Sequence, residues 1–412
     1  MKKRIAIIGA GISGISLARM LEDKADVTVL EQHAKIGGLI GCDRVEDVLY
    51  HRVGGHVFNS KNQDVLDWFW SFFNKEDEFI QANRLAKVYL NNVFIDYPIE
   101  DHVFQLNNAD AENIIDDLIN IKSVTSNNFE DFLINTFGIT LYEIYFKPYN
   151  KKIWNVDLKE VPLNWLEGKL PMPRPKDIIY NNVLRKQDKS MVHSVFYYPK
   201  YGGSQFIIDR LSEGIKIISN YKITKISTDK FTVKIDDFDP FDKVVFTGDI
   251  RTLNNLLQDK LILDQYESEL DNLKSNGTTN VLCYCDKTDL SWLYIPEDKF
   301  RAHRIIYTGG FSETNNGPSG RSTCTVEFSN FVSIEDIHEE IRKLPGNMEI
   351  LAHNYEPNSY VIQGENTRDL INKIKDSLRK HSIFILGRFA EWEYNNMDKC
   401  IESSINLINQ LI

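Results

Sequence analysis

The 412-residue chain is poor in cysteine, and the spacing of the few cysteines disfavours two classes of protein. There are five, Cys42, Cys283, Cys285, Cys324 and Cys400, with no CxxC pair and no Cys/His ladder of zinc-site spacing. A disulfide-stapled secreted fold and a structural zinc site are therefore both disfavoured, and we expect no metal site. This cysteine usage is typical of a reducing compartment, so we expect a cytoplasmic protein.

The chain also lacks long apolar runs and an excess of basic residues. No stretch approaches the roughly 20 apolar residues of a membrane span, and no signal-peptide pattern is visible, so we expect no membrane insertion. Asp and Glu number 59 against 48 Lys and Arg, which gives a net charge of −11. This charge disfavours nucleic acid as a partner. A composition of 42% hydrophobic and 26% charged residues is typical of globular proteins.

A glycine-rich loop stands near the N-terminus. The runs "RIAIIGA", "GISLARMLEDK" and "DVTVLEQ" predict a strand, a helix and a second strand, which form a β-α-β unit. Gly9, Gly11 and Gly14 fit the pattern G-x-G-x-x-G after the first strand, and their roles are a tight turn, close approach of a pyrophosphate, and close helix packing. Ser13 and the helix N-terminus offer donors to the phosphates. Glu31 ends the second strand, where it can bind a ribose.

A second glycine pair distinguishes between the possible dinucleotides. Gly37 and Gly38 begin six residues past Glu31, as in proteins whose FAD lies extended across the fold, and a nicotinamide domain has no need of them. A plain turn could carry the same glycine pair. The segments "KVVFTG" and "FILGRFAEW" are where such folds return the chain to the flavin. The sequence therefore predicts FAD as the cofactor.

The remaining pattern predicts an α/β fold with interleaved domains. It has a doubly wound, Rossmann-like FAD-binding domain, an inserted helical domain and an antiparallel β-sheet domain. We expect a helix over 64–79, a hairpin that turns at Asn91-Asn92, and a final strand that shares the sheet of the N-terminal unit. The predicted ranges are 1–75, 200–250 and 375–412 for the FAD-binding domain, 104–180 for the helical substrate or lid domain, and 76–103, 181–199 and 265–372 for the antiparallel sheet domain.

Taken in order, motifs along nearly the whole chain resemble those of the UDP-galactopyranose mutases. The run "HRVGGHVF" resembles that family's histidine loop, which implies that Gly55 and His56 lie against the flavin ring. The run "YFKPYNKKIW" resembles its substrate helix, which implies that Tyr145 and Tyr149 grip the uracil and that Trp154 contacts substrate.

The second half of the chain continues this resemblance. The run "SWLYIPEDKFRAHRI" resembles a segment that binds the diphosphate, which implies catalytic roles for Tyr294 and Arg304. The run "GRFAEWEYNNMD" resembles the C-terminal motif, which implies that Arg388 lies near the flavin pyrophosphate and that Tyr394 faces the substrate phosphates. The remaining residues that the resemblance implies are Tyr360 and Asn396 for substrate and Met397 for the cofactor.

The resemblance also implies a reaction. N5 of reduced flavin attacks the anomeric carbon of a UDP-hexopyranose and displaces UDP, and the opened sugar closes again as a furanose, with no net redox change. The implied partners are a nucleotide-sugar substrate, an unidentified flavin reductant and a second copy of the chain. The product would feed cell-surface polysaccharide synthesis. Arg304 and Lys169 are the cations expected to meet the departing diphosphate.

Several positions depart from the family pattern. Lys169 stands where the family has an arginine, and Arg174 is close enough in sequence to compensate. Asn59 and Asn396 stand where bacterial members have a histidine and an aspartate. His193 lies near the position at which eukaryotic members have an asparagine. These departures lie on the sugar side, so UDP-galactose and a close analogue such as a dTDP-6-deoxyhexose both stay open.

The same residues are also compatible with ordinary structural roles and with two different functions. His56 could be a turn histidine, Tyr145 and Tyr149 a core stripe, and Lys151-Lys152 a solvated pair at a helix end. A redox flavoenzyme of the amine oxidase or phytoene desaturase type shares the N-terminal pattern, although Leu39 stands where that group typically has arginine. A nucleotide-sugar-binding protein without catalysis is a further alternative.

Overall fold

A computed structural model describes residues 2–121, 125–163, 173–185 and 195–412. The predicted site residue Lys169 lies outside the described residues, as does His193. The first sheet is parallel, with strands in the order β18-β12-β1-β2-β9. Its strands are β1 Lys3–Ile8, β2 Ala25–Leu30, β9 Ile217–Ile218, β12 Lys243–Phe246 and β18 Ile383–Ile385. The prediction that the N-terminal unit and the last strand share one sheet is confirmed.

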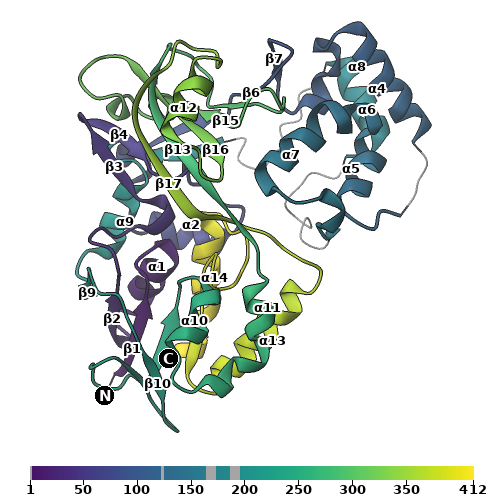
Figure 1. Cartoon of the computed structure of the whole chain (residues 1–412). Coiled ribbons are helices and arrows are strands. Elements are labelled where there is room, and N and C mark those ends of the chain that lie inside the picture. The colour runs from purple at the N-terminus through teal and green to yellow at the C-terminus, as the bar shows by residue number, and fades with distance from the viewer. Residues whose placement is uncertain (1, 122–124, 164–172, 186–194) are drawn as a thin grey trace.

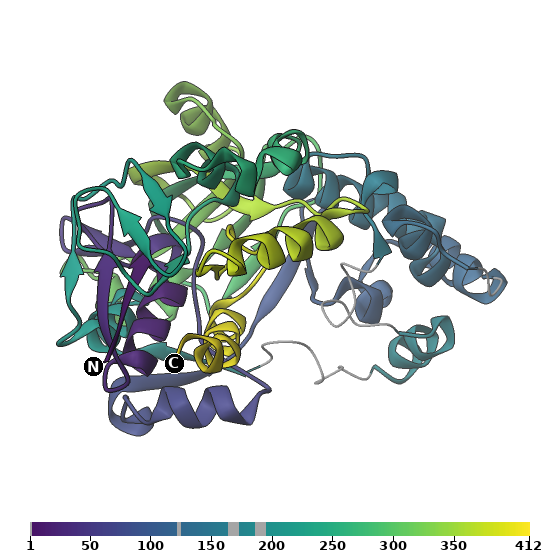
Figure 2. The ribbon, with the colours of Figure 1, turned by 90° about the horizontal axis from the view of Figure 1, so that it is seen from below.

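Helices cover both faces of this sheet, which explains why β1 is apolar on both sides. Ile5 and Ile7 pack in a core with α1 (Ile12–Leu21) and α14 (Met397–Leu411), which lie side by side (Figures 1 and 2). Ala6 and Ile8 point to the opposite core, with α10 (Ile250–Leu256) and α13 (Thr367–Arg379). The doubly wound arrangement is thus present.

The second sheet has the order β17-β13-β16-β15-β14-β6-β7, and all its pairs are antiparallel except β14 with β6. Asn91 and Asn92 both have positive φ and form the turn between β6 and β7, as the sequence predicts. The strands are β6 Ala86–Leu90, β7 Val93–Asp96, β13 Ser275–Cys285, β14 Trp292–Tyr294, β15 Ala302–Ile306, β16 Ser322–Ser329 and β17 Glu349–Val361.

A helical lobe stands beside the β6-β7 edge of the second sheet (Figure 1). Its core includes Val88, Trp292 and Tyr294 from that sheet, so the lobe is anchored to the edge strands. Its main helices are α4 Asn108–Asn120, α5 Phe129–Phe137, α7 Lys147–Trp154 and α8 Pro175–Leu184. The three parts are those expected, and the exact domain ranges stay predictions.

The predicted single helix over 64–79 is wrong. The structure has two helices, α2 Gln63–Trp70 and α3 Lys75–Glu78, followed directly by strand β5 (Phe79–Asn83). The side chain of Asn74 accepts bonds from the amides of Glu76 and Asp77. This N-cap starts a new helix, because it satisfies N–H groups that a continuous helix would bond internally.

Candidate functional site

A cavity of about 290 Å³ lies at the carboxyl ends of β1, β2 and β12, where doubly wound folds bind their ligands. The described residues of its wall come mainly from the two glycine loops, the histidine loop, the turn after β12 and the segment between β18 and α14, with further residues from strand β17. The predicted cofactor residues on this wall are Gly9, Gly11, Ser13, Glu31, Gly37, Gly38, His56, Arg388 and Met397. Gly14 and Gly55 are not part of this wall, and each packs so closely that a Cβ would meet a neighbouring atom within 3 Å.

The two glycine loops touch each other, and side chains would separate them. Gly37 donates its N–H to the carbonyl of Ala10 at 2.9 Å, and Gly11 and Gly37 form a parallel bridge. A Cβ on Gly38, whose φ is +55°, would lie 3.2 Å from the Cα of Gly11. A Cβ on Gly14 would lie 2.0 Å from the carbonyl oxygen of Gly9. The loops thus leave bare backbone and the N-terminus of α1 facing the cavity, which fits a pyrophosphate.

Glu31 is fixed in place by backbone donors. Its Oε2 accepts from the amide of Ala10 at 2.8 Å, and its Oε1 accepts from the amide of His33 at 2.9 Å. Each carboxylate oxygen can accept a second bond. Since Glu31 lines the cavity, it can still accept from a ribose hydroxyl.

His56 carries a buried nitrogen that lacks a protein partner. Its Nε2 has no hydrogen-bond partner among the described residues, although the residue lines the cavity. Burial, with the positive charge of Arg388, lowers the pKa of His56 to about 3. The ring is therefore neutral, and a buried polar atom of this kind fits a cofactor with polar ring edges such as a flavin. Gly55 explains the position, because a Cβ there would lie 2.7 Å from Ile306 Cγ2.

The low pKa of His56 predicts a pH-dependent stability. Unfolded protein protonates this histidine near pH 6.5, whereas the folded protein does so only near pH 3, so folding weakens as the pH falls through that window. Between pH 7 and pH 5, the free energy of unfolding of the wild type, measured with urea, should fall by about 2 kcal/mol more than that of His56→Gln. Equal losses in the two proteins would contradict a neutral, buried His56.

The predicted substrate aromatics form two groups of rings in contact. Tyr145 and Tyr149 stack with centroids 5.7 Å apart and planes at 8°, and the ring of Tyr149 meets Tyr294 edge-on at 5.5 Å. Tyr360 stacks on Tyr394 at 5.5 Å and 8°, and Trp154 packs edge-on against both. The first group lies between strand β14 and the helical residues from Tyr145 to Tyr149, and the second joins the end of α7 to strand β17 and the C-terminal segment.

Three of these phenols keep their protons. Burial raises the pKa of Tyr145, Tyr149 and Tyr360 well above the usual value. Tyr145 and Tyr149 can therefore act as hydrogen-bond donors, whereas Tyr360 donates its proton to Glu327.

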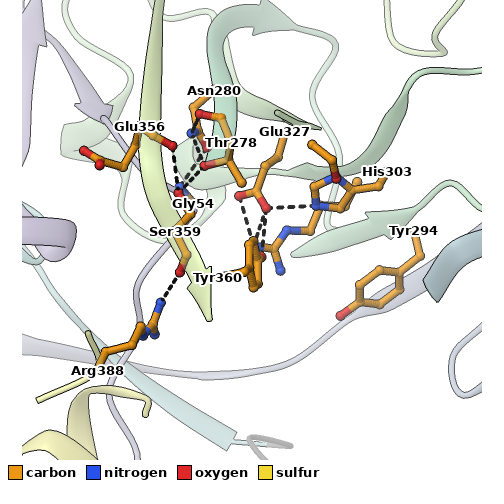
Figure 3. Close-up of polar contacts among 12 residues, drawn as sticks. Gly54, Thr278, Asn280, Tyr294, His303, Glu327, Glu356, Ser359, Tyr360 and Arg388 are labelled. Atoms are coloured by element: carbon orange, nitrogen blue, oxygen red, sulfur yellow. Dashed lines mark hydrogen bonds and ion pairs between the residues drawn. The ribbon is translucent and has the colours of Figure 1, made fainter. Parts of the chain in front are cut away.

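Arg304 stands at the centre of a buried charge cluster on β15 and β16. Its Nη2 lies 2.8 Å from Glu327 Oε1 and donates to the Tyr360 hydroxyl at 2.9 Å. His303 Nε2 also lies 2.8 Å from Glu327 Oε1, and the Tyr360 hydroxyl donates to that same oxygen (Figure 3). Although burial alone would raise it, Arg304 and His303 hold the pKa of Glu327 well below its usual range. Arg304 Nε is buried and has no partner among the described residues.

The cofactor cavity and the charge cluster meet at Gly54. A Cβ there would lie 3.7 Å from Arg304 Nη2 and 3.9 Å from His56 Nε2. The amide of Gly54 donates to Asn280 Oδ1 at 2.9 Å (Figure 3), which ties the histidine loop to strand β13. A group bound between the two would therefore contact both the cavity histidine and the arginine.

Arg388 and Asn396 occupy the C-terminal wall. The guanidinium of Arg388 donates to the carbonyls of Ser359 and Asn395 and lies 4.7 Å over the ring of Tyr394. Asn396 is the N-cap residue of α14, next to Met397 on the cavity wall. The individual roles of these residues stay predictions.

Three polar residues of the cluster were not predicted from the sequence. Glu327 and His303 lie on strands that are almost entirely buried, and a lone charged residue in "TCTVEFS" was a usable signal. Arg84 donates to the Tyr294 hydroxyl and lies 4.9 Å over the ring of Trp292. Arg174, expected to compensate for Lys169, is ion-paired with Asp177 at the exposed start of α8.

Comparisons with known proteins agree with this geometry. A family model described as "NAD(P)-binding Rossmann-like domain" matches residues 7–74. A dTDP-fucopyranose mutase of Escherichia coli is 24% identical over 98% of this chain and 96% of its own length. A UDP-galactopyranose mutase of Mycoplasma genitalium is 23% identical over 99% of this chain and 94% of its own length.

The fold matches as well. The crystal structure of a reduced UDP-galactopyranose mutase superposes with a TM-score of 0.88 at 22% identity, covering 99% of this chain and 95% of that one. The resemblance to the UDP-galactopyranose mutase family, first visible in the ordered motifs, is thus confirmed over the full length of the chain.

Proposed function

We propose that the chain is a flavin-dependent isomerase that interconverts the pyranose and furanose forms of a nucleotide-activated hexose. The observation that carries this proposal is the meeting of the cofactor cavity with the Arg304 cluster at Gly54. One site offers a neutral histidine to a flavin, and the adjoining site offers a cation to a diphosphate. The full-length relatives named mutases favour this function over a redox oxidoreductase.

FAD fits the cavity through the glycine loops, Glu31 and His56, and reduced flavin, when bound, supplies a nitrogen nucleophile for the anomeric carbon. Arg304 then stabilises the negative charge that develops on the departing diphosphate. On the other side of the site, Tyr149 offers an aromatic face to the pyrimidine. The buried setting strengthens these charges, since little water screens them.

The mechanism is thereby divided between two parts of the chain. The Rossmann-like part orients the flavin, while the second sheet and α7 orient the nucleotide sugar. Glu327 holds Arg304 in one direction through a buried ion pair, so its guanidinium is preorganised before substrate arrives. No net oxidation of the sugar is required, so an external reductant need only maintain the reduced flavin between turnovers.

The substrate is a UDP- or dTDP-hexose, since an aromatic face accepts either pyrimidine. We expect UDP-galactopyranose or dTDP-fucopyranose, the sugars named in the two full-length relatives.

The part of the chain that the structure describes has no helix long and apolar enough to cross a bilayer. All five cysteines are free and buried, as expected of a protein in a reducing compartment.

The deciding experiment is an anaerobic assay of the dithionite-reduced protein with each sugar nucleotide, read by chromatography. A new furanose product without flavin oxidation is the expected result. Substrate-coupled flavin reduction would instead indicate a redox enzyme, and binding without turnover would indicate a non-catalytic binding protein. Protein that is colourless and cannot be reconstituted with flavin would refute the proposal.

A further inference from the structure

Lys152 lies on α7, between Tyr149 and Trp154, and its ammonium group leaves the helix to bind the neighbouring sheet. Its Nζ donates to the backbone carbonyls of Ile295 at 3.0 Å, Glu297 at 2.6 Å and Ala302 at 3.3 Å. The prediction of a solvated Lys151-Lys152 pair is therefore wrong for Lys152, although Lys151 is exposed. A lysine near the C-terminus of a helix commonly donates to the last carbonyls of that helix, whereas Lys152 donates to carbonyls of another element.

The three carbonyls belong to the turn of one hairpin. Ile295 directly follows β14, Ala302 begins β15, and the strands pair Tyr294 with Arg304. The ammonium therefore joins the helix that carries the pyrimidine-side tyrosines to the hairpin that carries the diphosphate-side arginine. Asp298, Glu340 and Glu297 are the charged groups around it, and they favour its charged form, while burial opposes it.

A second contact holds the same turn of the helix. Asn276 on β13 donates from Nδ2 to the carbonyl of Ile153 at 2.8 Å and to that of Trp154. The helix ends here, with Asn155 in the left-handed conformation. Both contacts run from the end of α7 to the second sheet, so they fix the helix relative to the charge cluster.

We propose that Lys152 is a positioning residue that sets the spacing between Tyr149 and Arg304. This rests on the proposed function, in which these two residues bind opposite ends of one nucleoside diphosphate. The ligand has a fixed length, whereas its two binding residues lie on separate elements. Contacts between those elements must therefore hold the spacing, and a displacement of about 1 Å is enough to weaken a fitted site severely.

If Lys152 sets this spacing, its removal should weaken the binding of a whole nucleoside diphosphate but not the binding of its nucleoside or its diphosphate alone. In Lys152→Met, which keeps an unbranched side chain one atom shorter but removes its donors, the affinity of oxidised holoprotein for UDP should fall about tenfold, the worth of one net hydrogen bond. Affinities for uridine and for inorganic pyrophosphate, each measured alone by calorimetry, should change less than about twofold, because each contacts only one element. The flavin spectrum should be unchanged.

Lys151→Met is the matched control, since it removes an exposed lysine from the same turn and should leave all three affinities unchanged. If Lys152→Met fails to retain FAD, Asn276→Ala tests the second contact with the same three ligands and the same expected pattern. Unchanged UDP affinity, or a proportional loss for all three ligands, would overturn the positioning role. Wild-type protein that binds neither UDP nor dTDP would overturn the proposed function, and this inference with it.

Discussion

Replacing Arg304 with alanine should lower kcat by ~10²-fold or more, the scale expected when a charge donor to the transition state is lost. The partly buried guanidinium lies beside Glu327 and Tyr360, and its buried Nε has no partner among the described residues, so it is poised for a ligand oxygen. The substitution also leaves Glu327 as a buried charge without its arginine, which costs about 3–5 kcal/mol of stability. Steady-state kinetics and thermal unfolding should therefore be measured together.

Two companion variants separate these effects. Arg304→Lys keeps a positive charge beside Glu327 but loses the planar fork, so it should recover stability more than turnover. Arg301→Ala, which removes an exposed arginine from the same hairpin, should leave kcat unchanged, because that side chain pairs with Asp336 on α12 (Ile334–Ile341). A loss below about threefold in Arg304→Ala, well short of the donor-loss scale, would remove Arg304 from the site.

Substitution of Gly14 with alanine should abolish FAD binding. The new Cβ would lie 2.0 Å from the carbonyl oxygen of Gly9 and 3.2 Å from Ile7 Cγ2, so either α1 or the first loop must move. Moving α1 displaces the backbone N–H groups that face the cavity, and the phosphates lose their donors. The purified variant should be colourless, with an absorbance ratio showing little bound flavin.

Gly310→Ala provides the matched control for the glycine substitution. Among the described residues, the nearest atom to a Cβ on Gly310 would be the carbonyl oxygen of Leu290, at 3.9 Å, and the φ of Gly310 is not in the left-handed region. This variant should retain FAD and colour. Gly14→Ala protein that binds FAD within about threefold of wild type would show that the loop does not require a bare backbone at this position.

The cofactor half of the site was readable from the sequence because its signals are local. Gly9, Gly11, Gly14 and Glu31 belong to one β-α-β unit, in which spacing along the chain fixes spacing in the structure. The Gly37-Gly38 pair was also readable, although the structure adds that it packs directly against Gly11.

The substrate half was different, because no local pattern distinguishes its residues from an ordinary core. Tyr145 and Tyr149 have the spacing of any buried helix face, and only the ordered motifs singled them out. Glu327 and His303 acquire their role from strand pairing between β15 and β16, which the sequence does not specify. Lys152 was misassigned because a helix-end lysine is usually solvated, and its true partners come from a hairpin far along the chain.

The order of strands in the parallel sheet has a consequence for synthesis on the ribosome. Strand β1 pairs with β12 and β12 with β18, so the sheet draws on segments from both ends of the chain. The cavity wall likewise needs Arg388 and Met397. A growing polypeptide therefore leaves the side of the β-α-β unit that packs on α14 uncovered until almost all of its residues have been translated. Chaperone protection of that nascent segment, and cofactor capture only after release, follow from the topology.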